Sequence, residues 1–278
     1  MLPVIHFMGR EIGSYSIMAV LGLLTCGVVI TFLAKRRKII FANVILAMVS
    51  ATVGMLIMSH VLYGLVNYKT IVEAVRTIGS ISFMEFVIRI GTAFGGAVFY
   101  GGFLGGILGI YVFLRIEKDV DKNDLFDLYA VSVPLFHAFG RVGCFLAGCC
   151  YGVESHFGFI AEGNIYSPEV NGICRFPVQL AEAGLNIVLF AVLIYLFRRN
   201  SIRGLLIFIY LMVYPTYRFA LEFFRGDVHR GLWFGLSTSQ WISIVLFIIG
   251  AIGITVKLSN NKERKTWIRS NRQALSHR

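Results

Sequence analysis

Long apolar stretches dominate the pattern of hydrophobic and polar positions along this chain of 278 residues. A helix needs about 20 mostly apolar residues to cross the hydrocarbon core of a bilayer. Seven stretches reach this length, with edges placed to within several residues. They cover residues 15–34, 39–66, 85–114, 125–146, 176–197, 205–224 and 238–256. The pattern therefore predicts an all-α, polytopic membrane protein with about seven transmembrane helices.

The stretches differ in how polar they are. The fourth and fifth are less apolar than a helix that faces lipid, so we expect them to face protein or water. The second and third exceed the length of one crossing, which allows tilt or interfacial turns. The first has neither a basic segment before it nor a small-residue cleavage site, so we interpret it as a retained helix and not a signal peptide.

The composition agrees with this prediction and excludes other classes. Hydrophobic residues make up 57% of the chain. Charged residues make up only 15%, against about 25% in an ordinary soluble domain. These values exclude a disordered chain, a coiled coil and a secreted disulfide scaffold, and they argue against a soluble enzyme.

The basic residues are distributed unequally between the loops on the two sides of the membrane. The net charge is +11, from 26 Lys+Arg and 15 Asp+Glu. Seventeen basic residues follow the first, third, fifth and seventh stretches, six lie in the other loops, and three lie inside or at the ends of stretches. Cytoplasmic loops concentrate Lys and Arg, so the N-terminus is predicted outside and the C-terminus in the cytoplasm. We predict a transmembrane domain at 1–257 and a basic cytoplasmic tail at 258–278, which contacts anionic lipid and not nucleic acid.

Ionisable residues inside the apolar stretches occur in pairs at helical spacing. His137 and Arg141 lie four apart, as do Arg218 and Glu222, and each pair falls on one helical face. Ionisable groups at membrane depth are costly, so they are functional candidates. A purely structural ion pair is the alternative for any pair taken alone. The other members of this set are Gln179, Glu182, Arg225, Glu85 and Arg89.

A cavity lined by three arginines, two glutamates and a histidine suits an anionic substrate. The planar guanidinium binds phosphate best when it is partly desolvated, and apolar walls suit a lipid tail. The combination predicts a phospholipid site in which Arg holds the head group and Glu or His moves protons. Three roles stay open for Arg89: catalysis, binding of an outer-leaflet phosphate, or pairing with Glu85. We interpret His60 as a helix-end residue that faces the interface.

Glycines and cysteines mark two further segments. Glycines crowd the third stretch, where close helix packing is the favoured interpretation, and Tyr100 among them adds a hydroxyl. Cys144, Cys149, Cys150 and Cys174 lie at the outer end of the fourth stretch and in the following loop. We favour a disulfide, for example from Cys174 to Cys149 or Cys150, or a structural role. A reactive thiol is the alternative, and no metal is expected because the spacing matches no common zinc pattern.

Five motifs resemble those of the prolipoprotein diacylglyceryl transferases. The strongest is HAFGRVGCFLAGCCYG at 137–152, which is similar to the family signature G-R-x-G-N-F-x-N-x-E. It matches this signature at Gly140, Arg141, Gly143 and Phe145. The other motifs are GGAVFYGGFLGG at 95–106, RFPVQLAE at 175–182, YRFALEFFR at 217–225 and LSTSQW at 236–241. The resemblance implies a bacterial inner-membrane protein with seven helices, its N-terminus outside and its C-terminus inside.

The chain departs from the family pattern at several polar positions. Cys144 and Cys149 stand where the signature has Asn and Glu, and Ala147 replaces a second Asn. Tyr100 and Phe176 replace histidines of two other motifs. The arginines are kept, so the chain resembles a divergent branch of the family whose acceptor could differ.

The resemblance implies an enzyme that transfers the diacylglyceryl group of phosphatidylglycerol to the lipobox cysteine thiol of a prelipoprotein. Glycerol phosphate is released, and no metal or organic cofactor is needed. The expected partners are phosphatidylglycerol, prelipoprotein signal peptides and membrane lipids. The alternatives are a phosphatidylglycerol-dependent transferase with another acceptor, and a non-catalytic lipid-binding or transport protein, for which no inverted repeat is found.

The resemblance also implies roles for individual residues. Arg141 and Arg218 hold the phosphate with support from Arg225. Glu222 orients an arginine or accepts the thiol proton. His137 is a second candidate for proton transfer, with a hydrogen-bonded core histidine as the equal alternative, and Tyr100 is a candidate hydrogen-bond donor. The predicted substrate-binding set is completed by Tyr15, Gly140, Gly143, Gln179 and Glu182.

Overall fold

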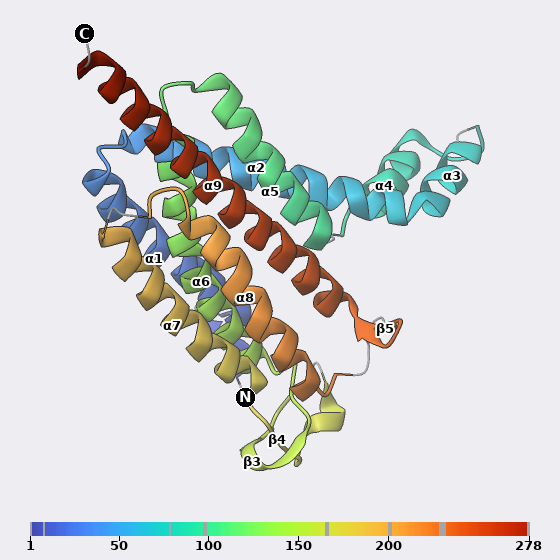
Figure 1. The fold of residues 1–278 in the computed structure, drawn as a ribbon. Helices are drawn as coiled ribbons and strands as arrows, with labels where there is room; N and C mark the ends of the chain where they lie inside the picture. The colour runs from blue at the N-terminus through green and yellow to red at the C-terminus, as the bar shows by residue number, and fades with distance from the viewer. Residues whose placement is uncertain are drawn as a thin grey trace. The chain divides into compact units, whose positions relative to one another are not determined.

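The computed structural model describes residues 2–7, 9–77, 79–96, 99–164, 167–199, 202–227 and 232–276. The side chains of residues 7, 99, 100, 103, 232 and 260–276 lie outside this description. The chain forms two compact units: residues 1–33 with 123–278, and residues 34–122. Figure 1 shows the helices that build them.

The first unit is a helical bundle. Its helices are α1 (Ser14–Arg36), α6 (Lys122–Ala147), α7 (Val178–Arg198), α8 (Leu206–Leu221) and α9 (Thr238–Ser276), where α1 runs three residues and α6 one residue past the unit boundary. Small residues allow close approach: a Cβ added at Gly22 of α1 would lie 2.9 Å from the Cβ of Phe139 on α6. A Cβ added at Gly253 of α9 would lie 2.1 Å from the ring of Phe208 on α8.

The second unit contains α2 (Phe41–Val66), α3 (Tyr68–Arg76), α4 (Phe83–Ala93) and α5 (Phe99–Ile116). Its main contact is between α2 and α5. A Cβ added at Gly105 would lie 2.0 Å from the backbone oxygen of Gly54, and one added at Gly109 would lie 2.0 Å from that of Ser50. The glycines of α5 therefore serve backbone-to-backbone packing, as predicted.

The described chain contains six helices that are long and apolar enough to cross a membrane, and a shorter apolar helix at Leu104–Ile116. This confirms the prediction of an all-α, polytopic membrane protein. The span at Lys122–Ala147 is the most buried of the six, at 44%, which confirms that the fourth stretch faces protein. The predicted tail begins inside α9, whose backbone is helical to Ser276.

The third predicted stretch, 85–114, is wrong as a single helix. α4 ends at Ala93 and α5 begins at Phe99. Two consecutive glycines, Gly95 and Gly96, follow α4, and glycine is a poor helix former. A Cβ added at Gly96 would lie 2.3 Å from the ring of Tyr63 on α2, so the chain passes close to that ring where the helix is interrupted.

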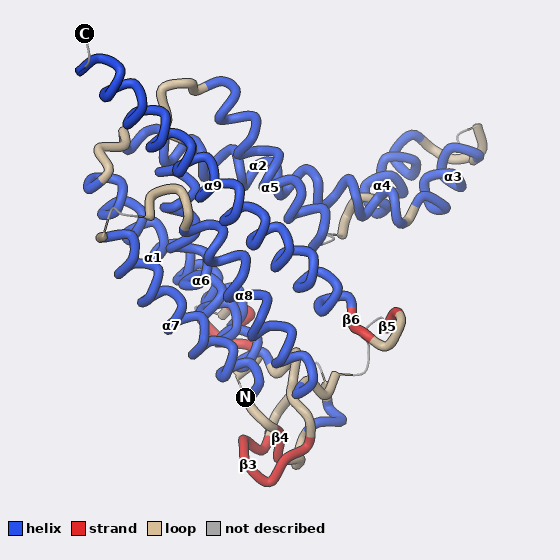
Figure 2. Tube along the Cα trace, viewed as in Figure 1, coloured by secondary structure: helices blue, strands red, loops and turns tan. Residues whose placement is uncertain are grey.

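Short antiparallel strand pairs precede α1 and connect α6 to α7 and α8 to α9 (Figure 2). β1 (Val4–Phe7) pairs with β2 (Arg10–Gly13), β3 (Glu154–Ile160) with β4 (Cys174–Arg175), and β5 (Leu232–Trp233) with β6 (Leu236–Ser237). The 3-10 helices are η1 (Pro168–Val170) and η2 (Glu222–Phe224). An isolated bridge joins Gly152 to Arg225, which ties the loop after α6 to the end of α8.

A fully buried carboxylate fixes the other end of α8. Asp127 of α6 accepts hydrogen bonds from the backbone N–H groups of Gly204 at 2.7 Å and Leu206 at 3.1 Å. These N–H groups lie at the start of α8 and have no partner inside the helix. Nearby, Asp124 pairs with Arg203. The two acidic residues anchor α8 to α6, and the site lies toward the opposite ends of these helices.

Candidate active site

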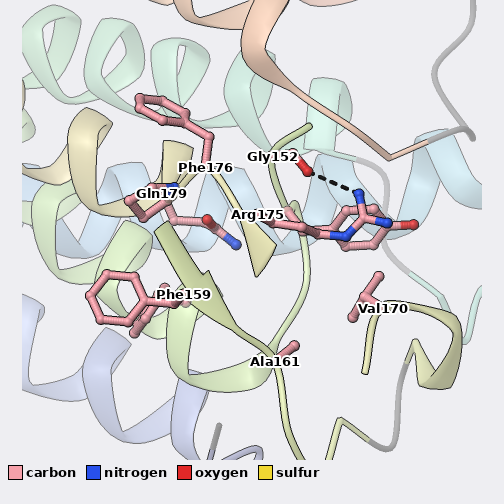
Figure 3. A pocket seen from close by; sticks show the side chains of 10 residues that line it. Gly152, Phe159, Ala161, Val170, Arg175, Phe176 and Gln179 are labelled. Atoms are coloured by element: carbon pink, nitrogen blue, oxygen red, sulfur yellow. Dashed lines mark hydrogen bonds between the residues drawn. The ribbon is translucent and has the colours of Figure 1, made fainter. Parts of the chain in front are cut away.

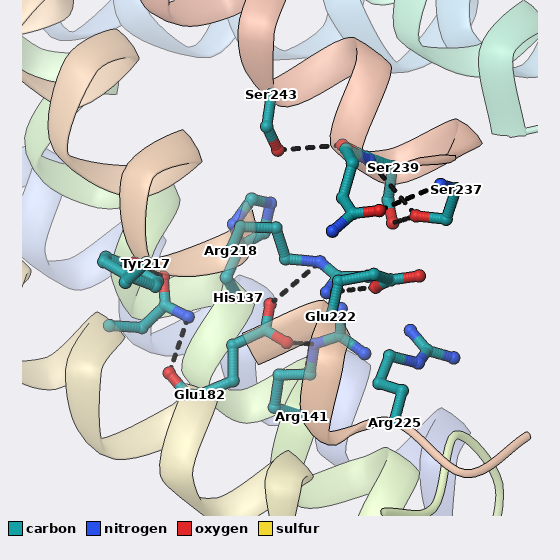
Figure 4. A network of polar contacts seen from close by, with 12 residues as sticks. His137, Arg141, Glu182, Tyr217, Arg218, Glu222, Arg225, Ser237, Ser239 and Ser243 are labelled. Atoms are coloured by element: carbon teal, nitrogen blue, oxygen red, sulfur yellow. Dashed lines mark hydrogen bonds and ion pairs between the residues drawn. The ribbon is translucent and has the colours of Figure 1, made fainter. Parts of the chain in front are cut away.

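Three helices of the first unit bring two arginines and two glutamates into one buried network (Figure 4). Glu182 of α7 lies between Arg141 of α6 and Arg218 of α8. Its Oε2 atom is 2.9 Å from Nε of Arg141, and its Oε1 atom is 3.8 Å from Nε of Arg218. The Glu182 side chain is 3% exposed. One buried carboxylate therefore joins two arginines that come from different helices.

Arg218 also pairs with Glu222, one helical turn further on. Its Nη1 atom is 2.7 Å from Oε2 of Glu222, so the predicted four-residue spacing is realised as an ion pair. The hydroxyl groups of Ser237, at the end of β6, and Ser239, in the first turn of α9, hydrogen-bond to Glu222. A buried ion pair is favourable only when its remaining polar atoms also find partners, and in this network Oε1 of Glu182 and Nη1 of Arg218 make no hydrogen bond among the described residues.

Arg225 lies at the edge of this network. It follows η2 in extended conformation, and its Nε donates to Oδ1 of Asp227 at 2.9 Å. Burial opposes the charge of Arg225, but the hydrogen bonds to Asp227 outweigh it and raise the pKa of the guanidinium above its usual value. The charge of Arg225 also acts on Glu222. The three predicted arginines therefore belong to one electrostatic cluster.

His137 packs among tyrosines, one turn before Arg141. Its ring centroid is 5.0 Å from that of Tyr214, and its Nδ1 atom is 3.4 Å from the hydroxyl of Tyr210. The Tyr210 and Tyr214 rings are stacked, with centroids 5.5 Å apart. These contacts are the ones expected of a hydrogen-bonded core histidine.

Two polar residues that support the network were not singled out from the sequence. Asn186 donates to the backbone oxygen of Glu182 at 2.8 Å, and the Tyr217 hydroxyl donates to Oδ1 of Asn186 at 2.9 Å. This pair links the turn of α7 that carries Glu182 to α8. Asn186 could have been found by the same signal as the ionisable pairs, because it lies four residues after Glu182 in an apolar stretch.

The three cysteines of the signature segment converge at the end of α6. The Sγ atoms of Cys144, Cys149 and Cys150 all lie within 4.8 Å of one another. The chain reverses at Gly148, whose φ is +79°, and the N–H of Cys149 donates to the Cys144 oxygen at 3.1 Å. All five cysteines of the chain are described, and none forms a disulfide. Cys174 lies in β4, which pairs with β3, and its thiol is free, so the structure does not contain the disulfide that the sequence favoured.

The pKa values of Cys149 and Cys150, which lie beyond the membrane-spanning helix, are shifted in opposite directions by their surroundings. Hydrogen bonds with Cys144 and Cys149, together with the charges of Arg225 and Arg141, hold the pKa of the Cys150 thiol well below its usual value. Hydrogen bonds with Cys144 and Cys150, together with burial, raise the pKa of Cys149. The Cys150 thiol therefore ionises more readily than the Cys149 thiol.

The other predicted binding residues surround this cluster. Gln179 of α7 donates to the backbone oxygen of Cys149 at 2.9 Å. A Cβ added at Gly143 would lie 3.1 Å from the ring of Tyr15, so the small residue lets α1 approach α6. No atom lies within 4 Å of a Cβ added at Gly140, which leaves open space on that side of α6. Tyr15 is half exposed.

The candidates of the second unit have local partners. Arg89 pairs with Glu85 at 2.6 Å, which is the pairing role among the three that the sequence left open. His60 is exposed, and its Nδ1 atom is 2.9 Å from the backbone oxygen of Phe94. The side chain of Tyr100 lies outside the described residues.

A small pocket lies under the loop that follows α6 (Figure 3). Arg175 borders it, donating from Nη1 to the backbone oxygen of Gly152 at 3.1 Å and lying over the Tyr151 ring. Of the predicted site residues, its described lining includes only Gln179. The arginine network, and not this pocket, therefore carries the prediction of an anionic substrate.

Fold and network together define a polytopic membrane protein with a buried cluster of arginines and carboxylates, and a cluster of thiols beside it. Sequence comparison gives its family. The chain belongs to the prolipoprotein diacylglyceryl transferase family, whose sequence profile matches residues 3–256. This confirms the resemblance found in the motifs.

Individual members of the family are similar to this chain over nearly their whole length. The phosphatidylglycerol–prolipoprotein diacylglyceryl transferase of Clostridium tetani is 30% identical over 90% of this chain and 95% of its own. The second such transferase of Clostridium perfringens is 31% identical over 92% of this chain and 95% of its own. That of Campylobacter hominis is 29% identical over 95% and 93%, respectively.

Proposed function

We propose that this chain transfers the diacylglyceryl group of phosphatidylglycerol to the lipobox cysteine thiol of a prelipoprotein, in the bacterial cell membrane, and releases glycerol phosphate. The carrying observation is that Arg141 and Arg218 share Glu182 inside the membrane-spanning bundle of a member of this family. A phosphodiester is the anionic part of the proposed donor. Guanidinium groups bind such groups through paired N–H donors.

The way Glu182 holds the arginines suits this role. The contacts of Glu182 with both arginines run through Nε, the inner nitrogen of the guanidinium. Nη1 of Arg218 faces Glu222 at 2.7 Å, at an angle that falls short of a hydrogen bond. An incoming phosphate oxygen can therefore compete for this donor.

In the proposed reaction the acceptor thiolate attacks the glyceryl carbon that bears the phosphate. A C–S bond forms, the C–O bond breaks, and its electron pair goes to the phosphate oxygen. Negative charge builds on that oxygen in the transition state, where donors fixed in advance stabilise it. Arg141 and Arg218 are the donors that the network fixes, and Arg225 adds positive charge at its edge.

The test is transfer of labelled diacylglyceryl from phosphatidylglycerol to a lipobox peptide by the purified chain. We expect Arg141→Ala and Arg218→Ala each to slow transfer by about 100-fold or more. Arg203→Ala is the matched control, because it breaks the ion pair with Asp124 at the other end of α6 and should leave the rate close to wild type. Wild-type rates in both network variants would refute the proposal.

The altered signature motivates a second candidate function, transfer to an acceptor other than a lipobox thiol, which the same experiment tests. Cys144 and Cys149 stand where the family signature has Asn and Glu, next to the arginines that are kept. Release of glycerol phosphate from the labelled lipid without labelling of the peptide would show a phosphatidylglycerol-dependent transferase that uses another acceptor.

A further inference from the structure

The cluster of three thiols lies at the site and has no role in the reaction as described so far. The Sγ atoms of Cys144, Cys149 and Cys150 lie within 4.8 Å of one another. Thiolates that share a zinc ion at about 2.3 Å in tetrahedral geometry lie about 3.8 Å apart. A contraction of at most about 1 Å would therefore bring the three sulfurs onto a common metal ion.

The backbone fixes this arrangement from several sides. The N–H of Cys149 bonds back to Cys144 at 3.1 Å, and Gln179 binds the Cys149 oxygen at 2.9 Å. The Tyr151 oxygen accepts from the N–H of Gly226 at 2.9 Å. Cys150 itself has a φ of +56°, a left-handed conformation that non-glycine residues seldom adopt. The surrounding contacts hold Cys150 in this conformation, and strain of this kind concentrates at functional sites.

The three sulfur donors determine which kind of metal ion the cluster would bind. Three sulfurs suit a soft cation, and thiolates select zinc and copper(I) over hard ions. Among the described His, Cys, Asp and Glu side chains, the group has three members. A catalytic zinc site has three protein ligands and an open fourth position, whereas a structural site has four. Cys149 and Cys150 are partly exposed, so the cluster can be reached from outside the protein interior.

We infer that Cys144, Cys149 and Cys150 form a three-thiolate site for a thiophilic divalent cation of the zinc class, whose fourth position takes the acceptor thiol. This inference rests on the proposed function. Three thiolates and a divalent cation carry a net charge of −1, and Arg141 and Arg225 lie close enough to Cys150 to offset it.

The inferred site supplies a step that the arginine network lacks. Both buried carboxylates of the network are committed to arginines, Glu182 to Arg141 and Glu222 to Arg218, so neither is a ready base. A thiol bound to zinc is deprotonated outright. A metal held by Cys144, Cys149 and Cys150 would bind the acceptor as a thiolate, and the thiol proton would go to solvent. The acceptor sulfur then forms the C–S bond as the C–O bond to phosphate breaks.

Cobalt(II) is the probe for the metal site, because thiolate coordination gives it intense absorption bands. We expect the metal-free, reduced, full-length protein in detergent to bind one cobalt with these bands, and zinc to displace it. Cys149→Ser and Cys150→Ser each remove a proposed metal ligand, so each should weaken cobalt binding by more than about 100-fold. Loss of a residue that only supports a ligand costs roughly 10- to 100-fold. Cys174→Ser is the matched control, since its thiol lies outside the cluster, and it should bind like wild type.

Activity separates this inference from the proposed function. If chelation abolishes peptide labelling and zinc restores it, both stand. Labelling that is unaffected by chelation, or a wild-type protein that shows no cobalt–thiolate bands, overturns the metal site and leaves the transferase intact. Cobalt bands in a protein that labels no peptide leave the metal site and refute the proposed function. A mass 2 Da below that of the reduced chain, lost in Cys149→Ser, would show a disulfide in the cluster and overturn the metal site.

Discussion

Neutralising Glu182 without changing its shape tests whether charge holds the network together. The Glu182 side chain is 3% exposed and lies 2.9 Å from Arg141, which is 19% exposed. In Glu182→Gln the side chain keeps its length and one acceptor oxygen. Arg218 keeps Glu222 at 2.7 Å, so Arg141 is the group that loses its carboxylate.

The expected loss follows from the distances. Two unit charges 2.9 Å apart attract by about 6 kcal/mol at an effective dielectric constant of about 20, and those 3.8 Å apart by about 4 kcal/mol. The cost of burying the charges offsets much of this attraction. Removing one partner of a buried pair costs about 3–5 kcal/mol. Because Arg141 keeps some contact with solvent, we expect a loss of about 3 kcal/mol for Glu182→Gln, at the lower end of that range.

Equilibrium unfolding in mixed micelles with a denaturing detergent measures this loss. The companion variant Glu182→Gln/Arg141→Met removes the unpaired charge as well. It should be more stable than Glu182→Gln, because replacing a whole buried pair by apolar groups is often neutral. A Glu182→Gln protein that unfolds within about 0.5 kcal/mol of wild type, the range of ordinary surface substitutions, would refute the reasoning.

Three further predictions concern other parts of the chain. Asp127→Ala leaves two N–H groups at the start of α8 without their acceptor and should cost about 1–3 kcal/mol for each; an unchanged unfolding midpoint contradicts this. Gly105→Ala would place a Cβ 2.0 Å from the Gly54 oxygen and should lower the unfolding temperature, whereas Gly91→Ala, with no atom within 4 Å, should not. Cys150 has a lowered pKa, so its thiolate is present above that value and lost only below it. In metal-free protein its alkylation by iodoacetamide should already be fast at pH 7, and a rate that rises only near about pH 8.5, as for an ordinary thiol, contradicts this.

Much of the candidate site could be predicted from the spacing of residues along single helices. Arg218 and Glu222 could be paired from the sequence because residues four apart on a helix must be neighbours. The same rule gave Glu85 with Arg89. The contact between Arg141 and Glu182 could not be derived in this way, because it depends on how α6 packs against α7. The sequence supplied both residues as candidates, and only the fold made them partners.

Two features of the fold lay beyond periodicity. Hydropathy joined α4 and α5 into one stretch, because a continuous apolar run does not show where the backbone leaves the helix between Ala93 and Phe99. Asp127 was not among the candidates taken from the sequence, yet it is fully buried and caps a helix that begins 79 positions later. Pairings at such separations follow from the assembled bundle and not from any local pattern.

The thiol cluster shows how a substitution pattern and a fold inform each other. In the sequence, the spacing of Cys144, Cys149 and Cys150 matches no common metal motif, so no metal was expected. The structure brings them together because the chain reverses at Gly148 directly after α6. Arg141 and Cys144 lie three positions apart on that helix, which is about 4.5 Å along its axis. A phosphate held by Arg141 and a thiolate held at the cluster would thus both be bound at the same end of α6. The end of one rigid helix can therefore present the donor lipid and the acceptor thiol to each other.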